Sequence, residues 1–172
     1  MLEQRTSVRV RKARPTDSEA LAAVFASSWS LAYTGILPEN HLRTMISRRS
    51  PGWWRTNLRS DGNMLVLQVG GKVAGYATCG PARSRGNVQG EIFELYLDPL
   101  YQGLGLGEHL FEGCRSILDS RRLRGLVVWA RVGLSFTSTT KRKRRTCWVS
   151  RTPRSCRSPC SQSPIPRAAP FG

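Results

Sequence analysis

The spacing of apolar residues changes along the chain, and the changes delimit the predicted elements. Residues 8–11 alternate between apolar and basic side chains, which is typical of a half-buried strand. Apolar residues then recur at helical spacing over 21–29, after Asp17 or Ser18 as the capping residue, and Gly35 ends this helix. The same criteria predict a second short helix over 39–46 and a stretch of turn residues with one helical turn over 48–63.

The apolar period becomes two after residue 63. Two strands are predicted over 64–69 and 72–79, joined by Gly70-Gly71, a dipeptide typical of a tight hairpin. Further strands are predicted over 91–97 and 125–130, with a glycine-rich loop and a helix to about residue 122 between them. Strand, two helices, three strands, helix and strand in this order predict a mixed β-sheet flanked by helices, in the α/β (α+β) class.

The regular spacing of apolar residues stops after residue 130. Residues 131–172 contain seven Ser, five Thr, five Pro and ten basic residues, but no acidic residue. Such a segment cannot bury enough apolar surface to offset the entropy cost of ordering it. We therefore divide the chain into a folded domain over 1–130 and a basic, disordered tail over 131–172.

The net charge of +16 divides in the same way. Residues 1–130 hold 17 Lys and Arg against 11 Asp and Glu, a net charge of +6, and the tail holds the other +10. The mildly basic domain suits an enzyme that binds a polyanionic molecule. The basic run 141–145 offers a nucleic-acid site, but no aromatic residues or binding fold accompany it, so we do not expect nucleic acid as a partner.

The sequence does not support a secreted protein, a membrane protein or a metal-binding protein. No apolar run is long enough for a signal peptide or a membrane span, so we expect a soluble, cytoplasmic protein that does not bind membranes. The five cysteines form no Cys-x-x-Cys pair, and the only histidines, His41 and His109, are far in sequence from any cysteine pair. We therefore expect no metal.

The loop after the strand over 91–97 carries the candidate chemistry. Glycine at 103, 105 and 107 precedes a helix, whose free N–H groups and positive end favour a phosphate or pyrophosphate. A dinucleotide-binding loop would need glycine where Glu108 stands, and a P-loop would need a Gly-Lys-Ser/Thr ending. The third alternative is a Gln/Arg-x-x-Gly-x-Gly/Ala loop, which Gln102, Gly105 and Gly107 match.

The context of this loop resembles the GNAT superfamily of N-acetyltransferases. The segment Leu-Tyr-Leu-Asp-Pro-Leu-Tyr-Gln-Gly-Leu-Gly-Leu-Gly over 95–107 is similar to the fourth strand and acyl-CoA loop of that family. The segment 29–38 resembles its first-helix region, and the resemblance extends over about residues 8–130. It implies transfer of an acetyl group from acetyl-CoA to a primary amine of a small molecule or peptide.

The resemblance also implies residue roles. The family's fourth strand offers backbone groups to the pantetheine arm, and the loop after it binds the pyrophosphate through N–H groups. In this chain the corresponding residues are Leu95, Tyr96 and Leu97 on the strand, and Gln102, Gly103, Leu104, Gly105, Leu106 and Gly107 in the loop. Trp29 and Tyr33, one helical turn apart, stand where the family builds its acceptor pocket, although core packing would explain Trp29 equally well.

A base is needed to take a proton from the substrate ammonium. Glu91 and Glu94 are candidates, and Glu91 stands where family members with a strand-four glutamate often have it. On a regular strand two residues three apart face opposite sides, so only one of them could face the cleft unless a bulge changes the parity. Glu91 is the predicted catalytic residue.

The end of the chain departs from the family. Members continue after the fifth strand with a helix that often supplies the tyrosine that protonates the thiolate, and then two strands. No tyrosine follows Tyr101, so we expect a sheet that lacks this helix and both strands, with an open edge that favours a homodimer. The composition of 131–172 is typical of a frameshifted reading of a GC-rich gene. The alternative function is therefore a non-catalytic relative that only binds acyl-CoA.

Overall fold

The computed structural model describes residues 7–60, 63–83, 88–131 and 145–150. The strands are β1 (Val8–Lys12), β2 (Met64–Val69), β3 (Lys72–Pro81), β4 (Gly90–Leu97), β5 (Leu126–Arg131) and β6 (Arg145–Ser150). The helices are α1 (Ser18–Tyr33), α2 (Glu39–Ser47), α3 (Pro51–Ser60) and α4 (Leu106–Ser120), with short 3₁₀ turns η1 (Pro15–Asp17) and η2 (Pro99–Tyr101).

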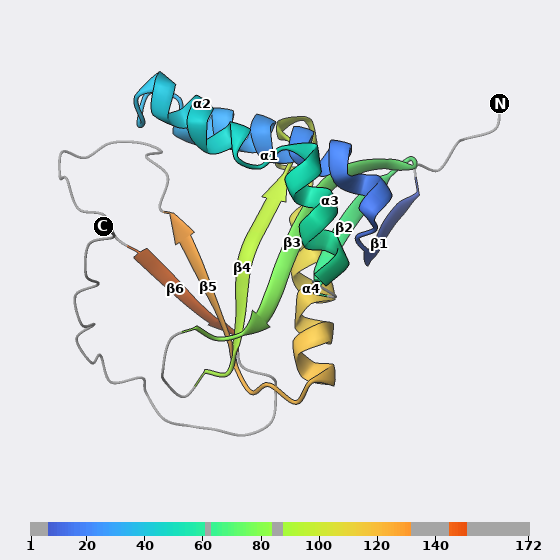
Figure 1. The fold of residues 1–172 in the computed structure, drawn as a ribbon. Helices are drawn as coiled ribbons and strands as arrows, with labels where there is room; N and C mark the ends of the chain where they lie inside the picture. The colour runs from blue at the N-terminus through green and yellow to red at the C-terminus, as the bar shows by residue number, and fades with distance from the viewer. Residues whose placement is uncertain (1–6, 61–62, 84–87, 132–144, 151–172) are drawn as a thin grey trace.

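The strands form one mixed sheet in the order β1-β2-β3-β4-β5-β6. Neighbours are antiparallel except β4 and β5, which are parallel, with α4 as the crossover between them. The helices α1 and α3 lie on one face of the sheet and α4 lies on the other (Figure 1). The predicted class, a mixed sheet flanked by helices, is confirmed.

Each face of the sheet has its own apolar core. Leu110, Cys114 and Leu118 of α4 pack against residues of β2, β3 and β4 on one face. On the other face, residues of α1 and α3, among them Phe25 and Trp54, pack against β2 and β3. The helix α3 is longer than the single turn predicted around Trp53, because Pro51 occupies its first position, where a missing N–H costs no hydrogen bond.

The parallel strands β4 and β5 separate after a short paired stretch. Their pairing covers only Gly90 to Ile92 on β4 and Leu126 to Val128 on β5. Beyond it the two strands diverge (Figure 1), so the edge of β4 over 93–97 is not paired with β5. Among the described residues no strand pairs with this side of β4 over 93–97, so a ligand can lie along it, although the Leu97 carbonyl already accepts side-chain hydrogen bonds.

A β-bulge in β4 changes which way its side chains face. Thr78 of β3 is paired with Glu94 and the next residue, Cys79, with Ile92, so Phe93 is an extra residue on β4. Ile92 packs in the core under α4, so its neighbour Glu91 faces the side of α1 and α3, and so does Glu94. The bulge places both carboxylates on one face, which a regular strand would not do.

The segment after β5 differs in part from the prediction. Residues 145–150, inside the predicted tail, form β6 and pair antiparallel with β5 along Leu126 to Arg131. The prediction of an open β5 edge, and of disorder at these six residues, is therefore wrong. Residues 132–144 and 151–172, including most of the basic run 141–145, lie outside the described residues. In the described part of the chain, no helix follows β5.

Candidate functional site

The turn after β4 is fixed to the N-terminal helix by side-chain hydrogen bonds. The Asp98 carboxylate accepts from the Leu100 N–H at 3.0 Å and from the Ser27 hydroxyl at 2.9 Å. The Leu97 carbonyl accepts from the Ser28 hydroxyl at 2.8 Å and from the Gln102 side-chain amide at 2.9 Å. The loop after the turn therefore starts from a rigid support, which explains why Gln102 precedes the glycines.

The glycine loop presents free amide groups to open space. Gly103 and Gly105 have φ of +76° and +73°, a conformation that side chains other than glycine rarely adopt. A Cβ at either position would have no heavy atom within 4 Å. Within the described ranges, no acceptor binds the N–H groups of residues 103–107. Together with the N-terminus of α4, they form a site suited to a pyrophosphate.

The first turn of α4 keeps this site open. Glu108, whose carboxylate would compete for the same positive potential, is exposed, as is His109. Gly107 packs against β4: a Cβ on it would lie 3.6 Å from a methyl group of Leu97 and 4.0 Å from one of Leu95. The loop residues and the strand residues predicted to bind the donor are therefore neighbours, with the free edge of β4 beside them.

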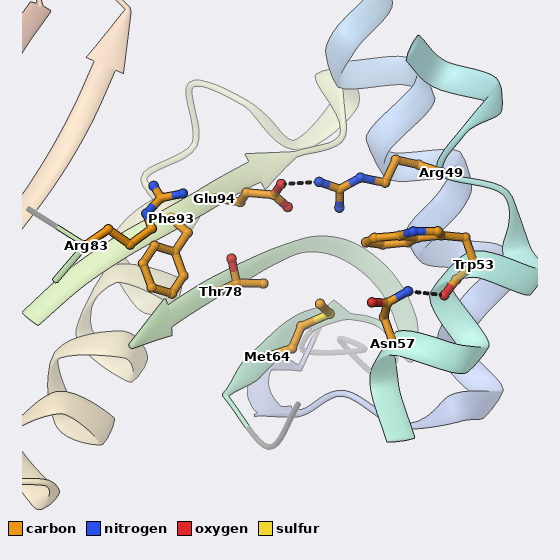
Figure 2. Close-up of a pocket in the computed structure, with 8 residues that line it drawn as sticks. All are labelled: Arg49, Trp53, Asn57, Met64, Thr78, Arg83, Phe93 and Glu94. Atoms are coloured by element: carbon orange, nitrogen blue, oxygen red, sulfur yellow. Dashed lines mark hydrogen bonds and ion pairs between the residues drawn. The ribbon is translucent and has the colours of Figure 1, made fainter. Parts of the chain in front are cut away.

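A pocket of about 390 Å³ lies on the α1 and α3 face of the sheet, next to the bulge (Figure 2). Phe93 and Glu94, at the point where β4 leaves β5, form part of its wall. The full lining consists of Arg49, Trp53, Asn57, Met64, Thr78, Arg83, Phe93 and Glu94. A donor that lies along the free edge of β4 would therefore have its reacting end near this pocket.

Glu94 is held at the pocket wall by two donors. Arg49 donates to one carboxylate oxygen at 2.8 Å and the Tyr76 hydroxyl to the other at 3.1 Å. Burial and the charge of Glu94 raise the pKa of Tyr76 far above its ordinary value, so its phenol stays protonated and donates. The Arg49 guanidinium lies 4.1 Å from the ring centroid of Trp53, and this stacking fixes its orientation.

Glu91 has a different environment. Its side chain is only 2% exposed and accepts hydrogen bonds from the backbone N–H of Arg83 at 2.8 Å and from the Arg83 guanidinium at 2.7 and 3.3 Å. Burial alone would raise the pKa of Glu91, but these hydrogen bonds outweigh it and lower the pKa. Glu91 does not line the pocket. Its catalytic role stays a prediction, whereas Glu94 is the carboxylate that faces the cavity.

Trp29 and Tyr33 belong to an aromatic cluster on α1. Their ring centroids are 4.6 Å apart, and Phe25 lies 5.0 Å from Trp29 and 6.1 Å from Tyr96 of β4. Neither Trp29 nor Tyr33 lines the pocket. Their predicted contact with the acceptor stays a prediction; the helix α1 that carries them packs against β4 and the turn η2.

Sequence reasoning missed three residues that shape this site. Arg49 is 45 positions from Glu94, and Trp53 was assigned only to a turn. Arg83 lies in the polar connection between β3 and β4 and carries no motif. The one available signal was the run Arg48-Arg49-Ser50-Pro51, because a Pro that follows polar residues and precedes two tryptophans is typical of a helix start.

The described residues contain neither a candidate metal site nor a membrane-spanning helix. No group of three or more His, Cys, Asp or Glu side chains there could hold a metal ion. Nor does any helix in these ranges combine the length and the apolar character needed to cross a membrane.

Comparison with known proteins gives one family. The model of the acetyltransferase (GNAT) family matches residues 25–137. The PaiA N-acetyltransferase of Thermoplasma acidophilum, solved in complex with coenzyme A, has a TM-score of 0.61 and 21% identity, over 73% of this chain and 80% of that chain. No curated protein sequence matches.

Two further solved structures are similar. A ribosomal-protein-alanine N-acetyltransferase from Brucella melitensis has a TM-score of 0.53 and 25% identity, over 73% of this chain and 76% of that chain. A GNAT family acetyltransferase from the same organism, in complex with acetyl-CoA, has a TM-score of 0.52 and 21% identity, over 75% and 79% of the two chains. At these identities the likeness concerns the fold.

Proposed function

The chain belongs to the GNAT family of acetyltransferases, and we propose that it transfers an acetyl group from acetyl-CoA to a primary amine of a small molecule or peptide. The observation that carries the proposal is the combination of free N–H groups over 103–107 with the unpaired edge of β4 over 93–97. The N–H groups suit a pyrophosphate, and the β4 edge suits an extended chain that ends in a thioester. Structures similar in fold have been solved with coenzyme A or acetyl-CoA bound.

In this proposal the loop binds the donor and β4 orients it. The amides of Gly103 to Gly107 hold the pyrophosphate, and the backbone of Leu95, Tyr96 and Leu97 pairs with the pantetheine arm. This arrangement carries the thioester toward Phe93 and Glu94. A β4 backbone N–H close to the bulge then stabilises the negative charge that develops on the carbonyl oxygen.

The acceptor enters from the pocket. Its amine nitrogen attacks the thioester carbonyl carbon, the C–N bond forms, the C–S bond breaks, and the coenzyme A thiolate leaves and takes up a proton. The attacking amine must first lose the proton of its ammonium form. Glu94 is the proton acceptor in this proposal because its carboxylate lines the pocket, whereas Glu91 is held by Arg83 with a lowered pKa.

A second function is favoured by the end of the chain. The family match ends at residue 137, and no tyrosine follows Tyr101 that could protonate the thiolate. The alternative is therefore a relative that binds acyl-CoA and does not turn it over. It shares the glycine loop and the β4 edge with the first proposal, so binding alone does not distinguish the two.

One experiment on the full chain separates these functions. Acetyl-CoA is titrated into the protein by calorimetry, and release of the coenzyme A thiol is then followed with a panel of amines and peptides. Binding together with amine-dependent thiol release supports the transferase, and binding without release supports the non-catalytic relative. Absence of binding refutes both.

A further inference from the structure

The charges in the pocket restrict the class of acceptor. Among its lining residues only Arg49, Arg83 and Glu94 are charged, so two guanidinium groups face one carboxylate. They come from opposite sides of the cavity, with Glu94 between them (Figure 2). Glu91 lies beneath Arg83 and offsets part of its charge, but it does not reach the pocket. Each guanidinium is thus paired with one carboxylate, so the pocket offers a polyamine no second carboxylate for its other ammonium groups.

Arg49 is arranged as a donor with unused capacity. Its guanidinium is held over the Trp53 ring at 4.1 Å and also lies 5.2 Å from Phe25 and 5.4 Å from Trp54, measured to the ring centroids. One terminal nitrogen donates to Glu94. The other terminal nitrogen points into the cavity (Figure 2) and has no acceptor among the described residues. A fixed guanidinium of this kind suits the two oxygens of a carboxylate.

Glu94 and Arg49 together match the two charged groups of an amino acid. Their contacting oxygen and nitrogen atoms are 2.8 Å apart, so the groups that they attract must also be close together. In an α-amino acid the ammonium and the carboxylate are attached to the same carbon. The ammonium can therefore lie against Glu94 while the carboxylate is bound by Arg49, and the amine stays at the bulge where the thioester ends.

The remaining walls indicate the side chain and the size. Trp53, Met64 and Phe93 provide the apolar part of the lining. The volume of about 390 Å³ is near the lower end of the range for small-molecule sites, which favours a free amino acid over a folded protein terminus. Building on the proposed transferase function, we infer that the acceptor is a free α-amino acid with an apolar or aromatic side chain, bound through Arg49 and Glu94.

The test compares each amino acid with its own carboxamide. Phenylalanine, phenylalaninamide, methionine, methioninamide and spermidine are offered to the full chain with saturating acetyl-CoA. The α-amino group of the carboxamide is less basic than that of the free amino acid, so a larger fraction of it is unprotonated. Intrinsic reactivity therefore favours the carboxamide. We expect kcat/KM for the acid to exceed that for its amide by at least about tenfold, from the charge-assisted hydrogen bonds to Arg49. Equal values, or a preference for the amide or spermidine, would overturn the inference.

Two arginine variants show which residue causes the preference. Arg49→Gln should reduce the ratio of acid to amide to one or below, whereas Arg49→Lys should retain part of the preference for the acid. The matched control is Arg55→Gln on α3, an exposed arginine that does not line the pocket, and it should leave the ratio unchanged. A loss of folding would lower both rates and leave their ratio intact. An unchanged ratio in a folded Arg49→Gln protein refutes the assignment.

The amino-acid site can be tested even if the proposed transferase function fails. If the protein binds acetyl-CoA without turnover, the same acids and amides are titrated by calorimetry into the protein saturated with coenzyme A. Tighter binding of the acids, lost in Arg49→Gln, supports the amino-acid site even though catalysis fails. If the acid and its amide bind equally, or if neither binds, in this titration, the inference is overturned. The result of the acetyl-CoA titration is not affected by that outcome.

Discussion

Replacement of Gly105 by leucine tests whether the loop over 103–107 binds the pyrophosphate of acetyl-CoA. Gly105 has φ of +73° and is the residue that precedes α4, and a Cβ there would have no heavy atom within 4 Å. A leucine at this position would place a bulky side chain in the loop that is proposed to bind the pyrophosphate. It would also cost about 1–2 kcal/mol in backbone strain, whether or not a ligand binds there.

A second glycine separates strain from binding. Gly71, in the hairpin between β2 and β3, has φ of +83° and also has no heavy atom within 4 Å of a Cβ. Gly71→Leu should therefore cost a similar strain without touching the loop. For a chain of this size, either variant should lower the melting temperature by roughly 2–8 °C. His109→Ala, at an exposed position beside the loop, is the second control.

The affinities should differ widely between the variants. Hydrogen bonds to a charged group contribute about 1.5–3 kcal/mol each, so loss of two loop amides weakens acetyl-CoA binding by roughly 3–6 kcal/mol, more than a hundredfold. Calorimetry should find this loss in Gly105→Leu, and a change of less than about threefold in Gly71→Leu and His109→Ala. Equal acetyl-CoA affinity in Gly105→Leu and Gly71→Leu would refute the pyrophosphate loop.

Four further outcomes are expected. Glu94→Gln should lower kcat/KM by roughly 10²–10⁴-fold, most strongly at low pH where the amine is protonated; a larger effect of Glu91→Gln would return the base to Glu91. The pKa of Asp17 is lowered because hydrogen bonds and charge from Arg11 and Arg14 outweigh its burial, so its stabilisation is present above pH 4 and is lost as the pH falls below the unfolded-state pKa. Asp17→Asn should therefore flatten the decline of stability in urea titrations below about pH 4, and an unchanged slope would contradict this. Trp54→Ala, at a fully buried position, should cost about 3–5 kcal/mol in urea unfolding. If residues 131–172 are a frameshift product, a one-base correction after codon 130 should raise both the melting temperature and the acetylation rate, whereas an uncorrected chain that melts cooperatively above about 50 °C and acetylates amines well would refute it.

The sequence alone determined the local elements and the position of the glycine loop. A period of two over 64–79 and helical spacing over 21–29 each reflect burial of one face, so the strands and helices could be predicted from neighbouring residues. The glycines at 103 and 105 also act locally, since a positive φ depends on the residue itself. The family resemblance rests on two continuous segments, 95–107 and 29–38, and it is confirmed.

The tertiary structure decided the pocket and the facing of the carboxylates. Phe93 becomes a bulge only because β3 pairs with β4 in a particular register, and this pairing turns Glu91 and Glu94 to the same face. Arg49 reaches Glu94 only because α3 packs on that face and Trp53 supports the guanidinium. Strand β6 likewise depends on its partner β5, because the strand-forming Thr146, Trp148 and Val149 stand among basic and polar residues without a longer apolar pattern. Each of these contacts joins residues far apart in sequence, and a periodicity that reports only on neighbours cannot encode them.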